Sequence, residues 1–258
     1  LRRAATRFEQ GSLSKTMKDP DKPYFSFIVP VYDRTQKLRE SIRSLLRQTY
    51  EHFEVLMICD GSPEGTLEVV AEFEDHPKVR TWKYTSNSGN ACRGRNRGIV
   101  MARGDFICLH DSDDIAHHER LARTAAAIVT HGADGVYGQT RILLDGTRRI
   151  DGIVNGQLLD PPEFDFDTLK QVNLMMTCSV AVRRDLLLRH GGFRPDMRYR
   201  EDHELWLRLA HHGCRWKRAD GLLCYYRVHA GNAELVLRGD DSHWFQRALE
   251  LHDKPFVN

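Results

Sequence analysis

Short apolar runs that alternate with amphipathic segments restrict the fold of this chain more than any other feature. Four runs are expected to form strands, over residues 25–32, 53–59, 79–84 and 106–109. The segments between them have helical spacing, over residues 33–48, 66–73 and 91–101. Strands and helices in this alternation predict right-handed β-α-β units and a largely parallel sheet.

The chain after residue 110 is less regular but still predicts both helices and strands. Helices are expected over residues 119–131, 184–190, 201–212 and 233–252. Strands are expected over residues 135–144, 147–150, 179–182, 214–217 and 222–228, with an Asp145-Gly146 turn joining the first two. Gly191-Gly192 should end the helix before it. Residues 152–176, which contain Pro161-Pro162, are expected to be irregular.

The two ends of the chain read as additions to one central domain. Residues 1–23 are expected to be a leader and linker, with a helical stretch over 2–10, because Pro20 and Pro23 exclude a continuous helix before the first strand. Residues 24–232 form the predicted domain, and residues 233–258 form a C-terminal helical tail. The chain starts with Leu1 rather than Met, so we expect it to be part of a longer protein.

Composition excludes several classes of protein. The 258 residues are 41% hydrophobic, which is ordinary for a globular core, and the net charge of +2 does not favour nucleic acid as a partner. No apolar run approaches the roughly 18 residues of a membrane helix, and no secretory signal is visible. The six cysteines include no CxxC pair. We therefore expect reduced thiols in a cytoplasmic protein.

Three carboxylates follow the 106–109 run almost directly, at Asp111, Asp113 and Asp114. Carboxylates this close repel one another unless a cation lies among them, and hard divalent cations take oxygen ligands. The carboxyl end of a buried strand is also where open α/β sheets bind ligands. The alternative is a polar turn in which Asp113 or Asp114 caps the next helix.

Similar polar groups stand at other predicted strand ends and helix starts: Pro30/Tyr32/Asp33, Asp60-Gly61-Ser62 and Glu201-Asp202. The first two follow parallel strands, so they should converge with the acidic cluster on one edge of the sheet. Each also has a simpler explanation. Asp60-Gly61-Ser62 is a common turn, and Tyr32 could be a core aromatic residue with its hydroxyl at the rim.

Taken together, these motifs resemble family 2 glycosyltransferases with the GT-A fold. The matching stretches are 28–34, 45–50, Asp60-Gly61-Ser62, Asn87-Ser88-Gly89, 95–98, 109–114, Gly191-Gly192-Phe193 and 201–209. The resemblance covers roughly residues 24–230. It implies a Rossmann-like, mostly parallel sheet flanked by helices. Residues 24–120 would be the nucleotide-binding half, and 121–232 a smaller, mixed acceptor-binding half.

The resemblance also assigns roles to individual residues. It implies that the nucleotide-sugar is bound by Pro30, Tyr32, Asp60, Arg95, Asp111 and Ser112. Asp60 would reach the base edge and Asp111 the ribose. Asp113 would coordinate Mn²⁺ or Mg²⁺ bridging the diphosphate, with His229 as a second metal ligand. The alternative for His229 is a strand-end histidine hydrogen-bonded to a neighbour.

Asp202 matches the catalytic base of the family, with Glu201 beside it. A base that faces the leaving group lets the acceptor hydroxyl attack C1 in line, and a single displacement inverts the anomeric centre. Aspartate is ionised at neutral pH unless its environment shifts it strongly, so it starts in the form that the role needs. The alternative is that Asp202 caps the helix that begins there.

The resemblance therefore predicts an inverting, metal-dependent enzyme that moves a sugar from a nucleotide-sugar, most simply a UDP-sugar, to a hydroxyl of a glycan or lipid-linked acceptor. It places the protein in the cytoplasm and is compatible with peripheral association at the inner face of the membrane, or with further domains. Two departures bear on donor specificity. One carboxylate stands in Cys59-Asp60 where the family pairs two, and Cys92-Arg93 replaces small apolar residues.

Two other functions remain open from the residues. A non-catalytic module of a larger polymerase would bind nucleotide-sugar or glycan without turnover. A sugar-phosphate nucleotidyltransferase would need a glycine-rich basic loop after the first strand, where residues 32–35 contain no glycine. His117-His118, and His211-His212 with Cys214, suggest zinc, but no set of four spaced ligands appears. Arg93 and Arg97 indicate either phosphate binding or a solvated helix face.

Overall fold

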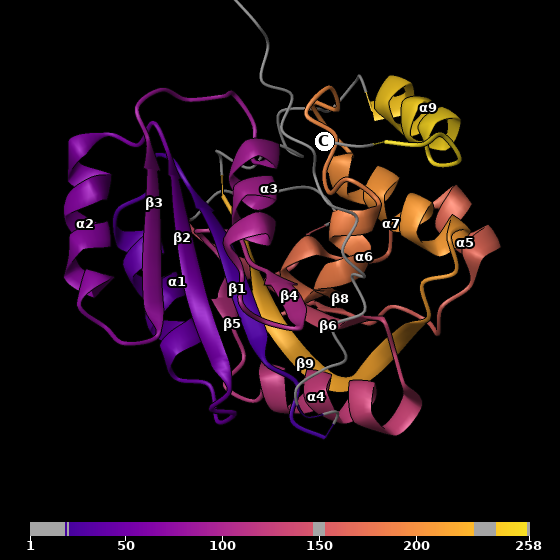
Figure 1. Ribbon diagram of the computed structural model, residues 1–258, viewed down its shortest axis with the longest axis horizontal. Helices are drawn as coiled ribbons and strands as arrows, with labels where there is room; N and C mark the ends of the chain where they lie inside the picture. Colours follow the sequence, from indigo (N-terminus) through magenta and orange to yellow (C-terminus); the bar gives the residue numbers. More distant parts are fainter. Residues whose placement is uncertain (1–18, 20, 147–152, 230–240, 257–258) are drawn as a thin grey trace, which may run out of the picture.

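The computed structural model describes residues 19, 21–146, 153–229 and 241–256. Its first part follows the predicted alternation (Figure 1). The elements are β1 (Phe25–Val31), α1 (Gln36–Leu46), β2 (Phe53–Asp60), α2 (Glu64–Glu74), β3 (Val79–Tyr84), α3 (Cys92–Met101) and β4 (Phe106–Leu109). Each predicted strand and helix of this part is present, with bounds that differ by at most a few residues. The leader helix predicted over 2–10 lies outside the described residues.

The second part departs more often from the prediction. Its elements are β5 (Ile115–Ala116), α4 (Arg120–His131), β6 (Gly135–Leu144), β7 (Leu158–Leu159), α5 (Phe166–Gln171), a 3₁₀ turn η1 (Thr177–Ser179), β8 (Ala181–Arg183), α6 (Arg184–Arg189), α7 (Glu201–His211), β9 (Trp216–Val228) and α9 (Asp241–Leu251). The two strands predicted at 214–217 and 222–228 are one strand, β9. Residues 152–176 were wrongly predicted to be irregular throughout, because they contain β7 and α5. The strand predicted at 147–150 lies outside the described residues.

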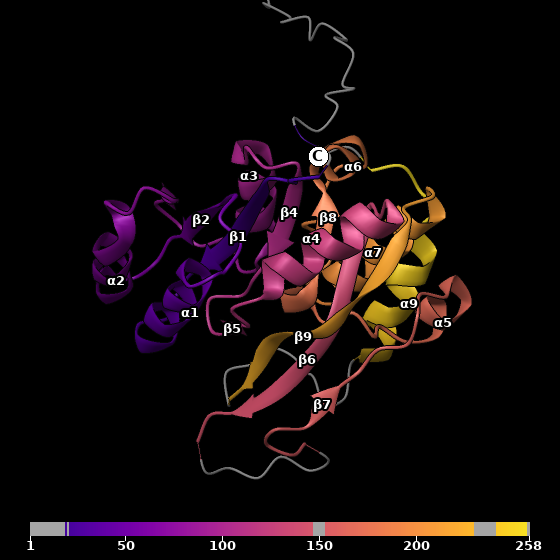
Figure 2. The ribbon, with the colours of Figure 1, turned by 90° about the horizontal axis from the view of Figure 1, so that it is seen from below.

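One sheet runs through both halves of the chain. Its strand order is β3-β2-β1-β4-β8-β6-β9-β5, with β7 paired to β6. The first four strands are mutually parallel, β8 is antiparallel to both its neighbours, and β6 and β9 are parallel. Seen from below, β6 and β9 run side by side as the longest strands of the sheet (Figure 2). The α/β fold class is confirmed. The parallel part is the N-terminal half, and the sheet as a whole is mixed.

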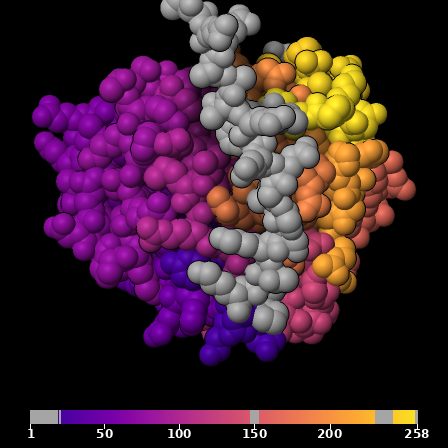
Figure 3. Space-filling model, in the orientation of Figure 1, coloured from indigo at the N-terminus to yellow at the C-terminus, as the bar shows by residue number. Residues whose placement is uncertain are grey.

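Helices cover both faces of this sheet. Apolar residues of α1, α2 and α4 pack with alternate residues of β1 and β2 in one buried cluster. The other alternate residues, such as Ile28 and Ile58, pack with α3, α6, α7 and α9 in a second cluster. The alternation follows from the two-residue side-chain period of a strand. In space-filling view the N-terminal half forms the left of the molecule and the C-terminal half the right (Figure 3).

Strand register brings the predicted polar groups to one edge. Pro30 pairs with Ile58 and Val31 with Cys59, while Ile28 pairs with Leu109 on the other side of β1. The ends of β1, β2 and β4 therefore lie side by side. Residues that follow these strands must share the carboxyl edge of the sheet, as in other open α/β folds.

Two glycines let α3 lie unusually close to β1. A Cβ at Gly98 would be 2.5 Å from Cγ2 of Ile28, and a Cβ at Gly94 would be 3.2 Å from Cβ of Pro30. Any larger residue at Gly98 would push α3 away from the sheet. This close packing holds α3, the helix that carries Arg95, against the sheet.

No helix in the described ranges is long and apolar enough to cross a membrane. All six cysteines are buried and free. Helix α9 packs against the second core through Ala248 and Leu251. Residues 233–240 of the helix predicted over 233–252 lie outside the described residues.

The short helix α5 depends on its N-terminal cap. Asp165 Oδ2 accepts hydrogen bonds from the backbone N–H of Thr168 at 2.7 Å and from its hydroxyl at 2.6 Å. We expect Asp165→Ala to lower the free energy of unfolding by about 1 kcal/mol, the usual cost of losing such a cap. Urea denaturation measures this. Asp167→Ala, in the first turn of the same helix, is the control and should change stability by less than half as much.

Candidate active site

One buried guanidinium joins the two halves of the chain at the carboxyl edge of the sheet. Arg95 is 5% exposed. Its Nη2 donates to Asp111 Oδ1 at 2.8 Å, and its Nη1 donates to Glu201 Oε1 at 2.7 Å. Asp111 follows β4, and Glu201 begins α7. The acidic cluster and the Glu201-Asp202 pair, far apart in sequence, therefore meet around a single side chain.

The charges in this arrangement support one another. Burial alone would lower the pKa of Arg95, but the carboxylates of Asp111 and Glu201 raise it, so the guanidinium is charged. Burial raises the pKa of Glu201; Arg95 opposes this shift, while the neighbouring Asp202 adds to it. Arg95 is thus the cation that allows these carboxylates to share one site.

Asp202 is held from two directions. Thr177 Oγ1 donates to its Oδ2 at 2.7 Å, and Asn173 Nδ2 approaches the same oxygen at 3.3 Å. The backbone N–H of His203 donates to Oδ1 at 2.7 Å. Arg200, just before α7, has a left-handed φ of 58°, which is strained for a residue with a side chain. This turn directs Glu201 and Asp202 into the site.

Asp113 faces the end of β9. Its Oδ2 is 2.8 Å from His229 Nε2 and 3.4 Å from Arg34 Nε. Burial would raise the pKa of Asp113, but the hydrogen bond with His229 and the charge of Arg34 hold it below its usual value. The carboxylate is therefore ionised. The predicted alternative for His229, a strand-end histidine bonded to a neighbour, describes its contact, and that neighbour is Asp113.

Asp114 differs from the other two members of the cluster. It is fully buried, and its Oδ1 accepts from the backbone N–H of Arg227 at 2.8 Å. Burial and the nearby Asp113 raise its pKa well above the usual value. Its role is to tie β9 to the β4 loop. Neither Asp113 nor Asp114 caps the next helix, because α4 begins at Arg120 and is preceded by Glu119.

The end of β2 forms another wall of the site. Asp60 Oδ2 accepts from Ser88 N–H at 2.9 Å and from Ser88 Oγ at 2.7 Å, and Asp60 Oδ1 accepts from Arg93 Nε at 2.6 Å. Gly61, at φ 68°, leaves no room for a Cβ, which would lie 2.3 Å from the backbone N of Asn87. Only glycine fits at this position of the Asp60-Gly61-Ser62 turn. A base edge could reach the Asp60 carboxylate only if one of these donors yields.

The remaining predicted residues have different exposures. Tyr32 is 49% exposed, so the alternative of a core aromatic residue is wrong. Pro30 is half-buried on β1, and Ser112 is buried within the acidic loop. Arg93 and Arg97 are both partly buried. Arg93 contacts Asp60, while Arg97 stacks on Trp82 with 3.8 Å from guanidinium to ring centroid.

A directional chain of hydrogen bonds supports the acidic loop from below. Arg120 Nη1 donates to His110 Nδ1 at 3.1 Å, His110 Nε2 lies 3.1 Å from Ser41 Oγ, and Ser41 Oγ donates to the carbonyl of Asp111 at 3.3 Å. Burial and the charge of Arg120 lower the pKa of His110 to about 3, so the imidazole is neutral. With Nδ1 accepting, Nε2–H must donate to Ser41. These hydrogen bonds fix the backbone of Asp111.

Comparison with known proteins identifies the family. The family model described as glycosyl transferase family 2 matches residues 26–191. The chain belongs to glycosyl transferase family 2. The UDP-Glc:alpha-D-GlcNAc-diphosphoundecaprenol beta-1,3-glucosyltransferase WfaP of Escherichia coli is 24% identical over 213 residues, which are 80% of this chain and 78% of WfaP. The poly(ribitol-phosphate) beta-N-acetylglucosaminyltransferase TarS of Staphylococcus aureus is 33% identical over 112 residues, 43% of this chain but only 20% of TarS.

Solved structures of this kind have the same fold. The crystal structure of S. aureus TarS 1-349 in complex with UDP aligns with a TM-score of 0.70 at 21% identity, covering 91% of this chain and 67% of that one. The mannosyltransferase PcManGT of Pyrobaculum calidifontis, in complex with GDP-Man and Mn²⁺, aligns with a TM-score of 0.61 at 20% identity, covering 87% and 64%. The predicted GT-A fold is confirmed.

Family 2 proteins of the GT-A fold are expected to use a divalent cation, and the side chains just after the ends of β4 and β9 fit one. Carboxylate oxygens are the ligands that Mg²⁺ and Mn²⁺ prefer. Such oxygens are present at Asp111 and Asp113, whose side chains are 30% and 14% exposed. The imidazole of His229 lies against Asp113. Among the described residues, one group of three possible ligands has its ligand atoms within 4.8 Å of one another, namely His117, His118 and Glu119. A cation at the ends of β4 and β9 would therefore need further ligands from the donor substrate.

The sequence did not point to several residues that contact the predicted site residues. Asn173 lies in the stretch predicted to be irregular, Thr177 lies directly after it, and Glu201 was noted only as the neighbour of Asp202. Ser41 is a small polar residue on the buried side of α1. The glycines of α3 were visible, and their spacing of four residues signals a helix that must approach a strand closely.

Proposed function

We propose that this protein is an inverting glycosyltransferase that moves a sugar from a UDP-sugar to a hydroxyl of a glycan or lipid-linked acceptor. The single observation that supports this most is the bridge from Arg95 to both Asp111 and Glu201. It brings a carboxylate cluster suited to a nucleotide diphosphate next to Asp202, which is suited to accept a proton.

On the donor side, the ends of β1 and β2 hold the nucleotide. The exposed ring of Tyr32 and the half-buried Pro30 offer apolar surface to a base. Asp60 orders the Ser88 loop that borders the same space, and Asp111 and Ser112 lie where the ribose would be placed. Arg95 lies near the sugar diphosphate and keeps Asp111 in position. The clustering of these groups on one edge supports their assignment to the donor.

Asp113 and His229 would hold a divalent cation at the diphosphate. Bound there, Mn²⁺ or Mg²⁺ supplies the positive charge that makes a nucleoside diphosphate a better leaving group. The hydrogen bond between Asp113 and His229 orients the carboxylate before any ligand arrives. Arg34 contributes a second positive charge at the same oxygen.

On the acceptor side, Asp202 would take the proton of the attacking hydroxyl. Its Oδ2 is oriented by Thr177 and Asn173, and α7 holds its backbone. A base on the face opposite the leaving group favours a single in-line displacement with inversion. The same position argues against a non-catalytic binding module, which would have no use for an oriented carboxylate there.

The relatives indicate the substrates. The name of WfaP gives UDP-Glc as the donor and a GlcNAc carried on diphosphoundecaprenol as the acceptor. The TarS structure contains UDP. We therefore propose a UDP-hexose or UDP-N-acetylhexosamine as the donor here, and action in the cytoplasm at the inner face of the membrane, where a lipid-linked acceptor would be presented. The matched regions span 78% of the length of WfaP but 20% of that of TarS.

A screen of nucleotide-sugars tests the proposal. The protein is incubated with UDP-, GDP- and dTDP-sugars and Mn²⁺, and release of the nucleoside diphosphate is followed with and without candidate acceptors. We expect release from at least one UDP-sugar that an acceptor accelerates, with inversion at C1 seen by NMR. Binding of UDP without turnover of any sugar would instead support a binding module.

Removing divalent cations should stop the reaction. We expect EDTA to abolish transfer, because without a cation nothing neutralises the charge of the departing diphosphate. Excess Mn²⁺ or Mg²⁺ should restore transfer. Asp113→Asn should need a higher Mn²⁺ concentration for half-maximal rate. Asp253→Asn, outside the site, is the control. Full activity in EDTA would contradict the assignment of Asp113 and His229.

A further inference from the structure

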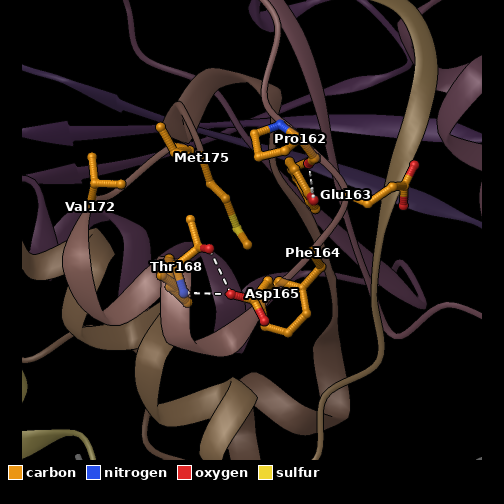
Figure 4. Close-up of a pocket in the computed structure, with 10 residues that line it drawn as sticks. Pro162, Glu163, Phe164, Asp165, Thr168, Val172 and Met175 are labelled. Carbon is orange, nitrogen blue, oxygen red and sulfur yellow. Dashed lines mark hydrogen bonds between the residues drawn. The ribbon is translucent and has the colours of Figure 1, made fainter.

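The cavity beside α5 is too small to hold a substrate. Its walls combine the ring of Phe164 with the carboxylates of Glu163 and Asp165 (Figure 4). Its volume is about 20 Å³, which is room for a single water molecule. Asp165 is already bonded to Thr168, so its carboxylate serves the helix cap. No sugar ring or nucleotide fits in this cavity.

A cluster of three metal-ligating side chains lies at the junction of β5 and α4 (Figure 2). His117, His118 and Glu119 each bring one possible ligand atom to this point, and these atoms lie within 4.8 Å of one another. The ligands of a tetrahedral zinc ion lie about 3.4 Å apart, because each is roughly 2.1 Å from the metal. Rotation of the side chains is enough to close this difference. None of the three residues belongs to the proposed donor site or to the proposed base.

The backbone of the two histidines is held from two sides. The N–H of His117 donates to the carbonyl of Leu223 on β9 at 2.9 Å. On the other side, the carbonyl of His117 accepts from Nε2 of Gln48 at 2.8 Å, and the carbonyl of His118 accepts from the N–H of Thr49 at 2.9 Å. The two rings lie side by side, with 4.4 Å between their centroids and 33° between their planes. This arrangement exists before any metal arrives, which lowers the entropy that binding must overcome.

His117 and Glu119 are in a form that can bind a metal. Burial and the charge of Arg123 lower the pKa of His117, so its ring is neutral at neutral pH and offers a lone pair. Nδ1 of His117 accepts from the N–H of Glu119 at 3.3 Å, a long hydrogen bond that costs little to replace. Oε2 of Glu119 accepts from Nη2 of Arg123 at 2.6 Å. A partner of this kind orients a carboxylate whose other oxygen binds the metal.

The chemistry of this cluster differs from that of the carboxylates after β4. Imidazole nitrogen is a preferred ligand of Zn²⁺, whereas Mg²⁺ and Mn²⁺ prefer oxygen ligands such as those of Asp111 and Asp113. Zinc also binds to three protein ligands when water takes the fourth position. The side chain of His118 is exposed, so water can reach that position. Two imidazoles and one carboxylate therefore favour zinc.

We propose that His117, His118 and Glu119 form a second metal site, which binds one Zn²⁺ ion through two imidazole nitrogens and one carboxylate oxygen, with water as the fourth ligand. The ion would join the end of β5 to the start of α4. Because it would bind the folded chain and not the unfolded one, it would stabilise the fold by mass action. The proposal goes beyond sugar transfer, since zinc binds at this site whether or not a sugar is transferred.

Titration with zinc tests the site directly. The chain is freed of metal with EDTA, exchanged into buffer with excess Mg²⁺ to saturate carboxylate sites, and titrated with Zn²⁺ against a chromophoric chelator. We expect one equivalent of Zn²⁺ to bind. His118→Ala should raise the dissociation constant at least tenfold, since losing even a group that only orients a ligand costs about 10–100-fold. His118 is the residue to replace because its exposed side chain can be removed without disturbing the core.

Two matched variants separate this site from other histidines. His131→Ala removes an exposed histidine from the last turn of α4, and His211→Ala removes one of the other pair that the sequence suggested for zinc. Both variants should bind zinc as the wild-type protein does. Binding that is lost in His211→Ala and kept in His118→Ala would place the ion elsewhere and overturn the proposal.

Thermal unfolding provides a second measurement. Zn²⁺ should raise the Tm of the wild-type protein and of His131→Ala, but not that of His118→Ala, because only an ion that binds the folded state shifts Tm upward. The proposal is wrong if the wild-type protein shows no saturable binding of Zn²⁺, or if His118→Ala leaves binding unchanged. Failure of the proposed glycosyltransferase function would look different, because zinc would bind as expected while no UDP-sugar is turned over.

Discussion

Replacing Asp202 by Asn is expected to lower kcat for sugar transfer by about 10²–10⁴-fold, the usual contribution of a general base. Asn has the same shape, and its carbonyl oxygen can still accept the hydrogen bonds of Thr177 and Asn173. It cannot take a proton from the acceptor hydroxyl. Donor affinity should change little, because the contacts of Arg95 with Asp111 and Glu201 remain. Initial rates and calorimetry with the UDP-sugar measure the two quantities.

The matched control for this variant is Asp253→Asn, which changes an exposed carboxylate just after α9. It should leave kcat unchanged. The helix-capping alternative predicts the opposite pattern for Asp202→Asn, with reduced stability and retained turnover. A variant with more than one tenth of the wild-type rate would exclude Asp202 as the base.

The first half of the fold could be predicted because its signals are local. Each of β1, β2 and β4 is a short apolar run that ends in a polar motif, and their parallel pairing aligns those ends. Given the alternation, the convergence of Pro30, Asp60 and Asp111 followed from topology alone. The one-glycine turn at Gly61 and the glycines of α3 then set distances that no periodicity reveals.

The second half resisted prediction because its elements depend on their partners. Strand β8 is three residues long and exists by pairing with β4 on one side and β6 on the other. Strand β9 looked like two strands because Asp220-Gly221 resembles a turn. The chain instead accommodates this dipeptide as a register shift opposite Gly138 and Gln139. Tertiary pairing overrode the local turn signal.

The candidate site residues were named from the sequence, but the contacts that hold them were not. Arg95, Asp111, Asp113, Asp202 and His229 were each singled out. What holds them comes from elsewhere in the sequence: Glu201 bonds to a residue 106 positions away, and Ser41 supports Asp111 from 70 positions away. Hydrogen bonds of this kind depend on the folded geometry and leave no pattern in a single sequence.

The bridge made by Arg95 leads to the second large expected effect. Arg95→Met should reduce the free energy of unfolding by about 3 kcal/mol, because removing one partner of a buried ion pair leaves the others uncompensated. The cost is at the lower end of the range for such pairs, since the Asp111 side chain is 30% exposed and can be solvated. Turnover should also fall, because Asp111 and Glu201 would no longer be held together. Chemical denaturation and initial rates measure these changes.

The control is Arg141→Met, which removes the same charge from an exposed arginine on β6. Any larger loss of stability in Arg95→Met then comes from the buried position of Arg95. The double variant Arg95→Met with Glu201→Gln separates the two roles of the bridge. Because Gln needs no counter-charge, part of the lost stability should return. Turnover should not return, since nothing would then connect Asp111 to α7. Recovery of activity together with stability would mean that Arg95 serves only to neutralise buried charge, and that the donor and acceptor sides do not depend on it for their alignment.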